Sequence, residues 1–466
     1  MRETSGLKEI RNDGVDERLL TAFRSAAAQV PAYRVLLAEH DVDVSDIVDA
    51  RTFTRLAPVT SKANTFERFP ISELSTPGRV ADVADVLTSS GRGGRFSFGL
   101  TTREQAAVTV DFLDSALDEA FQVKSKTTLA INCLPMGVVF SSNVMTLATT
   151  SVREDMAVAL VQTFGAQYDQ LLIVGDPLFL KRLTDHAREV GVDWQRYRVN
   201  AILGEEIFGE HYRGYLSASF GIDPEQPEHG YIMSSFGIGE LGLHLGYETP
   251  ATIALRRAAH RDPVVAREIF GVDGGAGAPV PMLFAYNPLR MFVETLDADE
   301  AGYGALTISM LDPSRRIPML RFQAGDIAAL LDSDRVASMA AARGLSLPGA
   351  LPRHLFALRG RSTEVLPTGG HVGTYKDSLY ARDSVARCIT GAVRLIVTGE
   401  DCAMHVQLTR STEPSDGLAQ EIAASAPASI RPPRVVLWRY AEFPFAMTLD
   451  YERKFAYYVP GESATG

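Results

Sequence analysis

The segment "LLIVGDPLFLKRLTDHAREVGV", residues 171–192, contains the pattern that decides the fold class. A short apolar run ends in a glycine and a carboxylate, and Pro177 follows at once. From there apolar side chains recur at helical spacing, and a proline suits the first turn of a helix. A strand, a turn and a helix form the unit of an α/β sheet, so the sequence predicts an α/β fold.

Two later segments repeat this pattern of an apolar run that ends in glycine and a carboxylate. They are "RVNAILGEEIF" (198–208) and "GYIMSSFGIGELG" (230–242). Ligands of α/β sheets bind beyond the carboxyl ends of the strands. We therefore expect Glu205, Glu206 and Glu240 to lie where binding or chemistry takes place.

Composition narrows the class of protein. The 466 residues are 46% hydrophobic and 22% charged, which suits a globular protein of two or more domains. A net charge of -11 argues against nucleic acid as a partner. Three widely spaced cysteines fit neither a disulfide framework nor a zinc motif, so we expect a reducing, cytoplasmic compartment. No apolar run approaches the roughly 20 residues of a membrane span, and we expect neither export signal nor membrane anchor.

The last hundred residues or so have a different order of elements. Strand-like runs at 392–399, 403–410 and 434–440 surround the helical "DGLAQEIAASA" (416–426). The segment "LRGRSTEVLPTGGHVG" (358–373) separates them from the longer part. The sequence predicts a large domain over 1–361 and a small, mobile domain over 362–466, with a hinge near Ser362.

The segment "TSSGRGGRFSFGL" (88–100) combines hydroxyls, glycines and two arginines. Small residues let successive backbone N–H groups converge on an anion, and a basic residue adds charge. The segment lacks the Gly-Lys-Ser/Thr ending of a P-loop and the glycine spacing of a dinucleotide fingerprint. Its composition alone favours a solvent-exposed loop, with a phosphate-binding loop as the alternative.

Several segments, in their order, resemble the adenylate-forming (ANL) ligases, and among them the phenylacetate-coenzyme A ligase branch and its acyl-protein synthetase relatives. Residues 88–95 stand in the place of the family's phosphate loop, with Arg95 where a lysine is usual. "AILGEEIFGEHYR" (201–213) resembles the Gly-x-Glu segment beside the adenine. "SSFGIGELG" (234–242) resembles the "YGxTE" segment, which implies that Phe236 stacks on adenine and that Glu240 holds magnesium.

The strongest match is "GALTISMLDPSRRIPMLRFQAGDIAAL" (304–330), which implies that Asp326 binds both ribose hydroxyls. A carboxylate that accepts two hydroxyl donors suits a ribose. "FALRGRSTE" (356–364) resembles the hinge segment, with Arg361 approaching the ribose. "MTLDYERKFAYYV" (447–459) resembles the carboxy-terminal lysine segment, with Lys454 contacting the acyl carboxylate and the α-phosphate.

The resemblance implies a large multi-sheet N-terminal adenylation (AMP-binding) domain and a small α+β C-terminal lid domain. It implies catalytic roles for Lys454, Glu240 and Arg95, with Glu240 as the metal ligand. The nucleotide would bind Thr88, Ser89, Ser90, Gly91, Gly94, Gly204, Glu205, Ser235, Phe236, Gly237, Asp326, Arg321 and Arg361. An acyl pocket would be lined by Val138, Phe140 and Met233, whose apolar side chains suit an aromatic or short acyl group.

The function that follows is ATP- and magnesium-dependent adenylation of a small, aryl acid and its transfer to coenzyme A. A homodimer is expected by analogy alone. Some relatives hold zinc in a Cys/His cluster after the "YGxTE" segment. Residues 241–288 contain His244 and His260 but no cysteine, so we predict no structural zinc there and favour a structural or solvent-facing role for His244.

Other functions remain open at this point. The acceptor could be a carrier-protein thiol, a protein cysteine or an amine, and nitrite could replace the carboxylate in a diazotisation. The replacement of several family threonines, for example by Gly239 and Ala324, makes such divergence plausible. A degenerate nucleotide-binding scaffold is the alternative that is not an enzyme; Asp326, Glu240 and Lys454 together argue against it.

Overall fold

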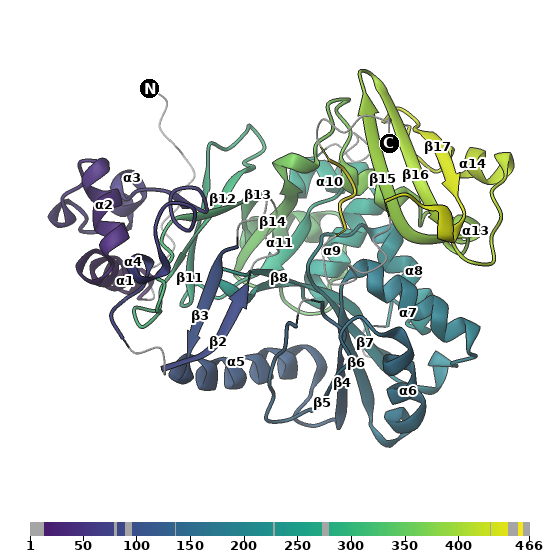
Figure 1. Ribbon diagram of the computed structural model, residues 1–466, viewed down its shortest axis with the longest axis horizontal. Coiled ribbons are helices and arrows are strands. Elements are labelled where there is room, and N and C mark those ends of the chain that lie inside the picture. Colours follow the sequence, from purple (N-terminus) through teal and green to yellow (C-terminus); the bar gives the residue numbers. More distant parts are fainter. Residues whose placement is uncertain are drawn as a thin grey trace.

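The structure is a computed structural model that describes residues 14–78, 82–88, 96–135, 137–226, 229–272, 279–428, 430–445 and 455–459. It has a large α/β part and a small C-terminal part with its own sheet (Figure 1). The fold class predicted from the sequence is confirmed. Five predicted phosphate-loop residues, Ser89, Ser90, Gly91, Gly94 and Arg95, lie outside the described residues, as does Lys454.

A twelve-stranded sheet forms the centre of the large part. Its parallel half runs in the order β5 (Thr146–Thr149), β4 (Thr128–Asn132), β6 (Gln170–Gly175), β7 (Val199–Leu203) and β8 (Ile232–Ile238). Every residue of β4, β6 and β7 is buried. Strands covered on both faces read as continuous apolar runs, which is why "LLIVG" identified β6.

The sheet continues beyond β8 in an antiparallel half. Its order is β9 (Gly242–Tyr247), β10 (Met282–Ala285), β14 (His354–Arg361), β13 (Phe322–Asp332), β12 (Gly304–Met310) and β11 (Met291–Leu296), and β1 (Thr60–Ser61) pairs with β13. A separate ribbon consists of β2 (Val83–Thr88) and β3 (Phe98–Thr102). The pairing changes from parallel to antiparallel at β8. Strands β13 and β14, which come much later in the chain, therefore lie in the same sheet as β7.

Helices flank this sheet, and the N-terminal helices lie at one end of it. The flanking helices are α5 (Arg103–Phe121), α6 (Glu154–Phe164), α7 (Pro177–Glu189), α8 (Glu210–Phe220), α9 (Pro250–Arg261), α10 (Pro263–Phe270) and α11 (Ser333–Ala342). The N-terminal helices are α1 (Val15–Gln29), α2 (Pro31–Glu39), α3 (Ala50–Leu56) and α4 (Ile71–Leu74), which gather at the left of Figure 1. Pro31 begins α2 directly after α1, and α7 begins at Pro177 as predicted. None of the described helices is long and apolar enough to cross a membrane.

The small part follows β14. It contains α12 (Val372–Ser378), α13 (Asp383–Ala386), β15 (Ile389–Thr398), β16 (Asp401–Leu408), α14 (Asp416–Ala423) and β17 (Arg434–Trp438), and β16 is the central strand. Its buried apolar side chains form a separate core that runs from Leu366 to Tyr457. In Figure 1 its sheet lies at the upper right, beyond α7 and α8. The boundary near Ser362 remains a prediction.

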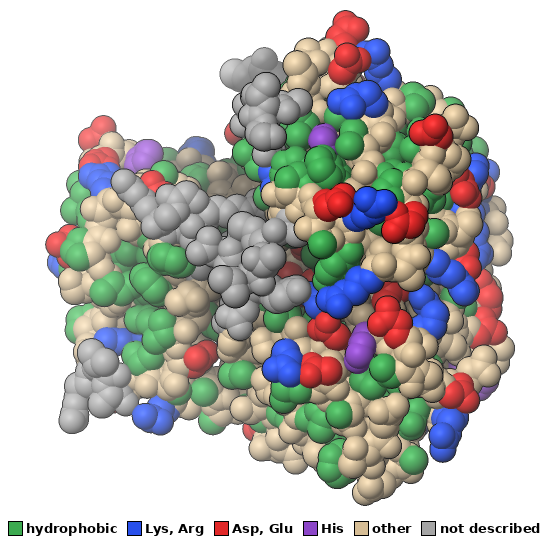
Figure 2. Space-filling model, turned by 45° about the vertical axis from the view of Figure 1, so that its right-hand side comes forward, with side chains coloured by type: hydrophobic (Ala, Val, Ile, Leu, Met, Phe, Trp, Pro, Cys, Tyr) green, Lys and Arg blue, Asp and Glu red, His purple; other side chains and the backbone are tan. Residues whose placement is uncertain are grey.

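The surface carries both signs of charge. In Figure 2, basic and acidic side chains are interspersed over the right-hand side of the face shown. A surface that binds nucleic acid concentrates Lys and Arg instead. This face therefore has the mixed charge that the overall composition suggests.

Candidate active site

Two adjoining cavities open at the carboxyl ends of β7 and β8. The first has a volume of about 160 Å³. Its apolar wall consists of Leu87, Leu113, Leu117, Leu134, Val138, Phe140, Leu172, Val174, Ile202, Ile238 and Leu243. Its polar wall consists of Lys62, Thr88, Gly204, Glu205, Ser235, Gly237, Gly239, Glu240, His244 and Arg361, with Ala324 beside them. One cavity thus joins an apolar pocket to a charged rim.

The second cavity has a volume of about 100 Å³ and lies between the large sheet and the C-terminal part. Both cavities share Glu205, Ser235, Gly237 and Arg361 in their walls. The second also contacts Phe236, Asp326, Lys376, Phe455 and Tyr457. Residues from widely separated segments therefore meet at the two cavities, and eight of the thirteen residues that the sequence predicted for a nucleotide are among them.

Asp326 and Arg361 face each other across neighbouring strands. They are directly paired in the register of β13 and β14, and Arg361 Nε donates to Asp326 Oδ1 at 3.4 Å. Asp326 is only 6% exposed. A buried carboxylate is costly unless polar partners accompany it. The long contact to Arg361 suits a carboxylate that gains further donors from a ligand.

Glu240 lies at the junction of β8 and the apolar pocket. It is 2% exposed, and its Oε1 accepts from the Ser97 hydroxyl and lies 2.7 Å from Lys62 Nζ. Mg²⁺ binds one or two carboxylates and the phosphates of a substrate. Both of these contacts are to Oε1, so Oε2 fits the role of a metal ligand. Lys62 is 40% exposed and is therefore able to move aside.

His244 adds a polar group to the first cavity. Its Nδ1 is 3.0 Å from Ser235 Oγ, and its backbone has a positive φ of 58°. Burial lowers the pKa of His244 to about 4, and the positive charge of Arg290 acts in the same direction. The imidazole is therefore neutral near pH 7, so one ring nitrogen can donate a hydrogen bond and the other can accept one.

The turn after β7 places two carboxylates near the second cavity. Glu205 has a positive φ of 71°, which a non-glycine residue adopts only at an energetic cost and which recurs at functional sites. Glu206 forms an ion pair with Lys376 at 2.6 Å. Behind them, burial raises the pKa of Asp176 to about 6. This turn connects the large sheet with α12 of the C-terminal part.

Solved structures with a similar fold come from a 2-hydroxyisobutyryl-CoA ligase. In the postadenylation state with 2-HIB-AMP, it matches with a TM-score of 0.69 and 13% identity, over 96% of this chain and 89% of that chain. With R3-HIB-AMP the TM-score is 0.66, at the same identity and coverage. The chain has the fold of the adenylate-forming CoA ligases. In the thioesterification state with CoA, that ligase matches with a TM-score of 0.53 and 14% identity, over 95% and 89% of the two chains. No protein-family model and no curated protein matches the sequence.

Within this ligase fold, two predicted site residues lie apart from the cavity walls. The Arg321 guanidinium binds the Glu294 carboxylate at 3.2 Å and the carbonyl of Ala57 at 2.5 Å. Met233 is 3% exposed and packs in the apolar cluster behind the first cavity. Arg321 is thus part of a buried ion pair with Glu294, and Met233 packs behind the apolar pocket.

Phe236 is placed differently from the expected free stacking surface. It borders the second cavity, but its ring also packs on Phe284 and Phe356, with ring centroids 5.8 and 5.6 Å away. Its ring is thus part of an aromatic cluster that backs the cavity. Stacking on adenine remains a prediction for the face that borders the cavity.

Lys62 and Lys376 are two basic residues of the cavity walls that were not among the site residues predicted from the sequence. Lys62 belongs to "VTSKAN" (59–64), which resembles the segment of the adenylate-forming ligases that leads to the nucleotide site, and this resemblance could have identified it. No sequence pattern identified Lys376, which is a single lysine in the short helix α12. Its Nζ lies 3.6 Å from the centre of the Tyr457 ring and reaches Glu206 only through the tertiary fold.

Proposed function

We propose that this protein is an ATP-dependent, AMP-forming ligase. It would adenylate a small carboxylic acid and pass the acyl group to a nucleophile. One observation carries the proposal: Asp326, Arg361 and Glu205 border a polar cavity that adjoins an apolar one, with Glu240 at the rim. The shared fold with CoA ligases supports the same function.

The chemistry has two steps. A carboxylate oxygen of the acid attacks the α-phosphorus of ATP, the bond to pyrophosphate breaks, and a mixed acyl-AMP anhydride forms. The acceptor then attacks the acyl carbon, and AMP leaves with the electron pair of the broken C–O bond. Both steps depend on positioning and on the stabilisation of negative charge.

Each residue has a role in this scheme. Asp326 would accept hydrogen bonds from the ribose hydroxyls, and Arg361 would hold that carboxylate in place. Lys62, and Lys454 from outside the described residues, would offset negative charge on the carboxylate and the α-phosphate. Mg²⁺ held by Glu240 would neutralise charge on the phosphates.

The apolar cavity supports an aryl or other compact acid as the substrate. Val138, Phe140 and the surrounding leucines offer no charge, so the carboxylate of the acid would face the rim at Lys62 and Glu240. Coenzyme A is the acceptor that we favour, because a neighbour of the same fold was solved with 2-HIB-AMP and CoA.

The test is ATP–pyrophosphate exchange over a panel of aryl and short acyl acids, with nitrite as a further arm. Products are then identified with and without coenzyme A. We expect exchange with at least one aryl acid and a thioester only when coenzyme A is present. If no acid or oxyanion releases pyrophosphate although ATP binds, the protein is a nucleotide-binding scaffold and the proposal fails. Lys454→Ala should abolish exchange and leave ATP binding intact.

A further inference from the structure

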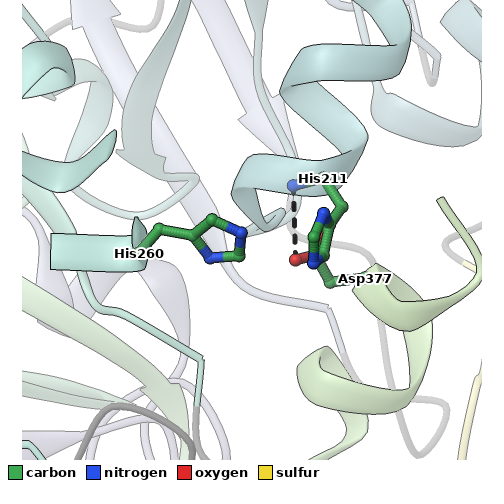
Figure 3. Close-up of side chains that lie close together, drawn as sticks. All are labelled: His211, His260 and Asp377. Carbon is green, nitrogen blue, oxygen red and sulfur yellow. Dashed lines mark hydrogen bonds between the residues drawn. The ribbon is translucent and has the colours of Figure 1, made fainter. Parts of the chain in front are cut away.

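Three potential metal ligands meet outside the cavities described above. His211 lies in the first turn of α8, His260 in the last turn of α9, and Asp377 in α12. One ligand atom from each lies within 4.8 Å of the other two. Figure 3 shows both imidazoles and the carboxylate directed toward one another from three separate elements.

Asp377 is held firmly in this position. Its Oδ1 accepts from the backbone N–H of Tyr212 at 2.9 Å, so the carboxylate caps the start of α8 from a distant segment. A Cβ at Gly209 would lie 2.0 Å from Asp377 Cγ, so this approach requires glycine. Its Oδ2 makes only a 3.4 Å contact with the N–H of His211. Capping occupies one oxygen well and leaves the other weakly bonded.

The imidazoles are suited to a cation as well. Their ring centroids are 4.5 Å apart in an edge-to-face arrangement. His211 is exposed and His260 half-buried, so an ion can reach the cluster from solvent.

The donor set points to one class of ion. Two imidazoles and one carboxylate suit Zn²⁺, whereas Mg²⁺ and Ca²⁺ prefer oxygen ligands. Tetrahedral zinc with bonds near 2.05 Å places its ligand atoms about 3.3 Å apart. The ligand atoms lie within 4.8 Å of one another, so an ion would draw them together by up to about 1.5 Å.

We propose that His211, His260 and Asp377 form a binding site for a divalent ion of the zinc class, with water as a fourth ligand. The ion would fasten α12, the first helix after the predicted hinge near Ser362, to α8 and α9 of the large part. The predicted absence of structural zinc concerned a Cys/His cluster within residues 241–288, and of the three ligands only His260 belongs to that segment. The three ligands do not line the two cavities described above, although Lys376, next to Asp377 in α12, borders the second one.

The experiment uses the full chain without a histidine tag. The chelator-treated protein is titrated with Zn²⁺ by calorimetry and with Co²⁺ by visible absorption, which reports tetrahedral ligation. The variants are His211→Ala, His260→Ala and Asp377→Asn, the last of which keeps a carbonyl oxygen for the Tyr212 N–H. His40→Ala is the matched control, because His40 is exposed at the end of α2.

We expect the wild type and His40→Ala to bind one ion per chain and to gain thermal stability from it. Each cluster variant should bind at least about tenfold more weakly, a loss typical of damaged metal sites. Wild-type protein that binds no stoichiometric ion would overturn the proposal. So would a His260→Ala variant with wild-type affinity, because the ion would then bind elsewhere. A circular dichroism spectrum equal to that of the wild type shows that each variant is folded.

Discussion

Replacing Asp326 by alanine tests the proposed nucleotide site most directly. The carboxylate is 6% exposed and borders the cavity of about 100 Å³, where Arg361 is its partner at 3.4 Å. A hydrogen bond to a charged group contributes about 1.5 kcal/mol or more. Two ribose hydroxyls would together contribute about 3 kcal/mol, which corresponds to about 150-fold in ATP affinity.

The assay is calorimetric binding of ATP and 2′-deoxy-ATP to the wild type and to Asp326→Ala. The wild type should bind 2′-deoxy-ATP about tenfold more weakly than ATP, because one of the two bonds is lost. Asp326→Ala should bind both nucleotides about equally weakly. The control is Asp332→Asn on the same strand, since asparagine caps a helix as well as the aspartate that now caps α11.

Two outcomes of these binding measurements would refute the proposed role of Asp326. If Asp326→Ala weakens ATP binding but still discriminates against 2′-deoxy-ATP, the carboxylate does not contact the ribose. If it binds ATP as the wild type does, Asp326 is not part of the nucleotide site. Either result would require another residue to recognise the sugar.

Three further predictions concern charge and burial. Lys62→Met should slow adenylation about 100-fold, because it removes the ammonium 2.7 Å from Glu240; an unchanged exchange rate would exclude Lys62 from the mechanism. The pKa of His244 is lowered to about 4 in the folded protein, so as the pH falls the unfolded chain takes up a proton at His244 before the folded chain does. The free energy of unfolding therefore decreases as the pH is lowered from 6.5 to 4. In urea unfolding, the free energy of unfolding of His244→Asn should decrease by about 1–3 kcal/mol less than that of the wild type over this pH range. A pH profile identical to that of the wild type would contradict this. Arg256→Met should lower the free energy of unfolding in urea by about 3–5 kcal/mol, because buried Glu210 loses an ion-pair partner at 2.8 Å. A loss below about 1 kcal/mol would show that Glu210 tolerates the removal of Arg256.

The sequence could predict features that depend on neighbours along the chain. The run at 171–175 indicated a buried parallel strand, and Pro177 indicated the start of the following helix. The position of Glu240 just beyond β8 followed from the same rule. Periodicity and turn chemistry act within a few residues, so they are readable from one sequence.

The partners of the site residues were not readable in this way. The sequence suggested Arg321 as a nucleotide contact, yet the fold places Glu294 beside its guanidinium. It singled out Glu240 but not Lys62, which lies far away in the chain. Such pairs are fixed by strand order and register, to which local patterns contribute nothing.

By itself, then, the sequence determined the α/β class, the order of the elements and the strand ends at which the candidate site forms, because these follow from local hydrophobic spacing. Only the tertiary structure decided which charges meet there, and that His211, His260 and Asp377 converge from α8, α9 and α12. The physical reason is that these contacts depend on packing between distant segments. Their spacing in space is set by the whole sheet and its helices, not by their spacing in the chain.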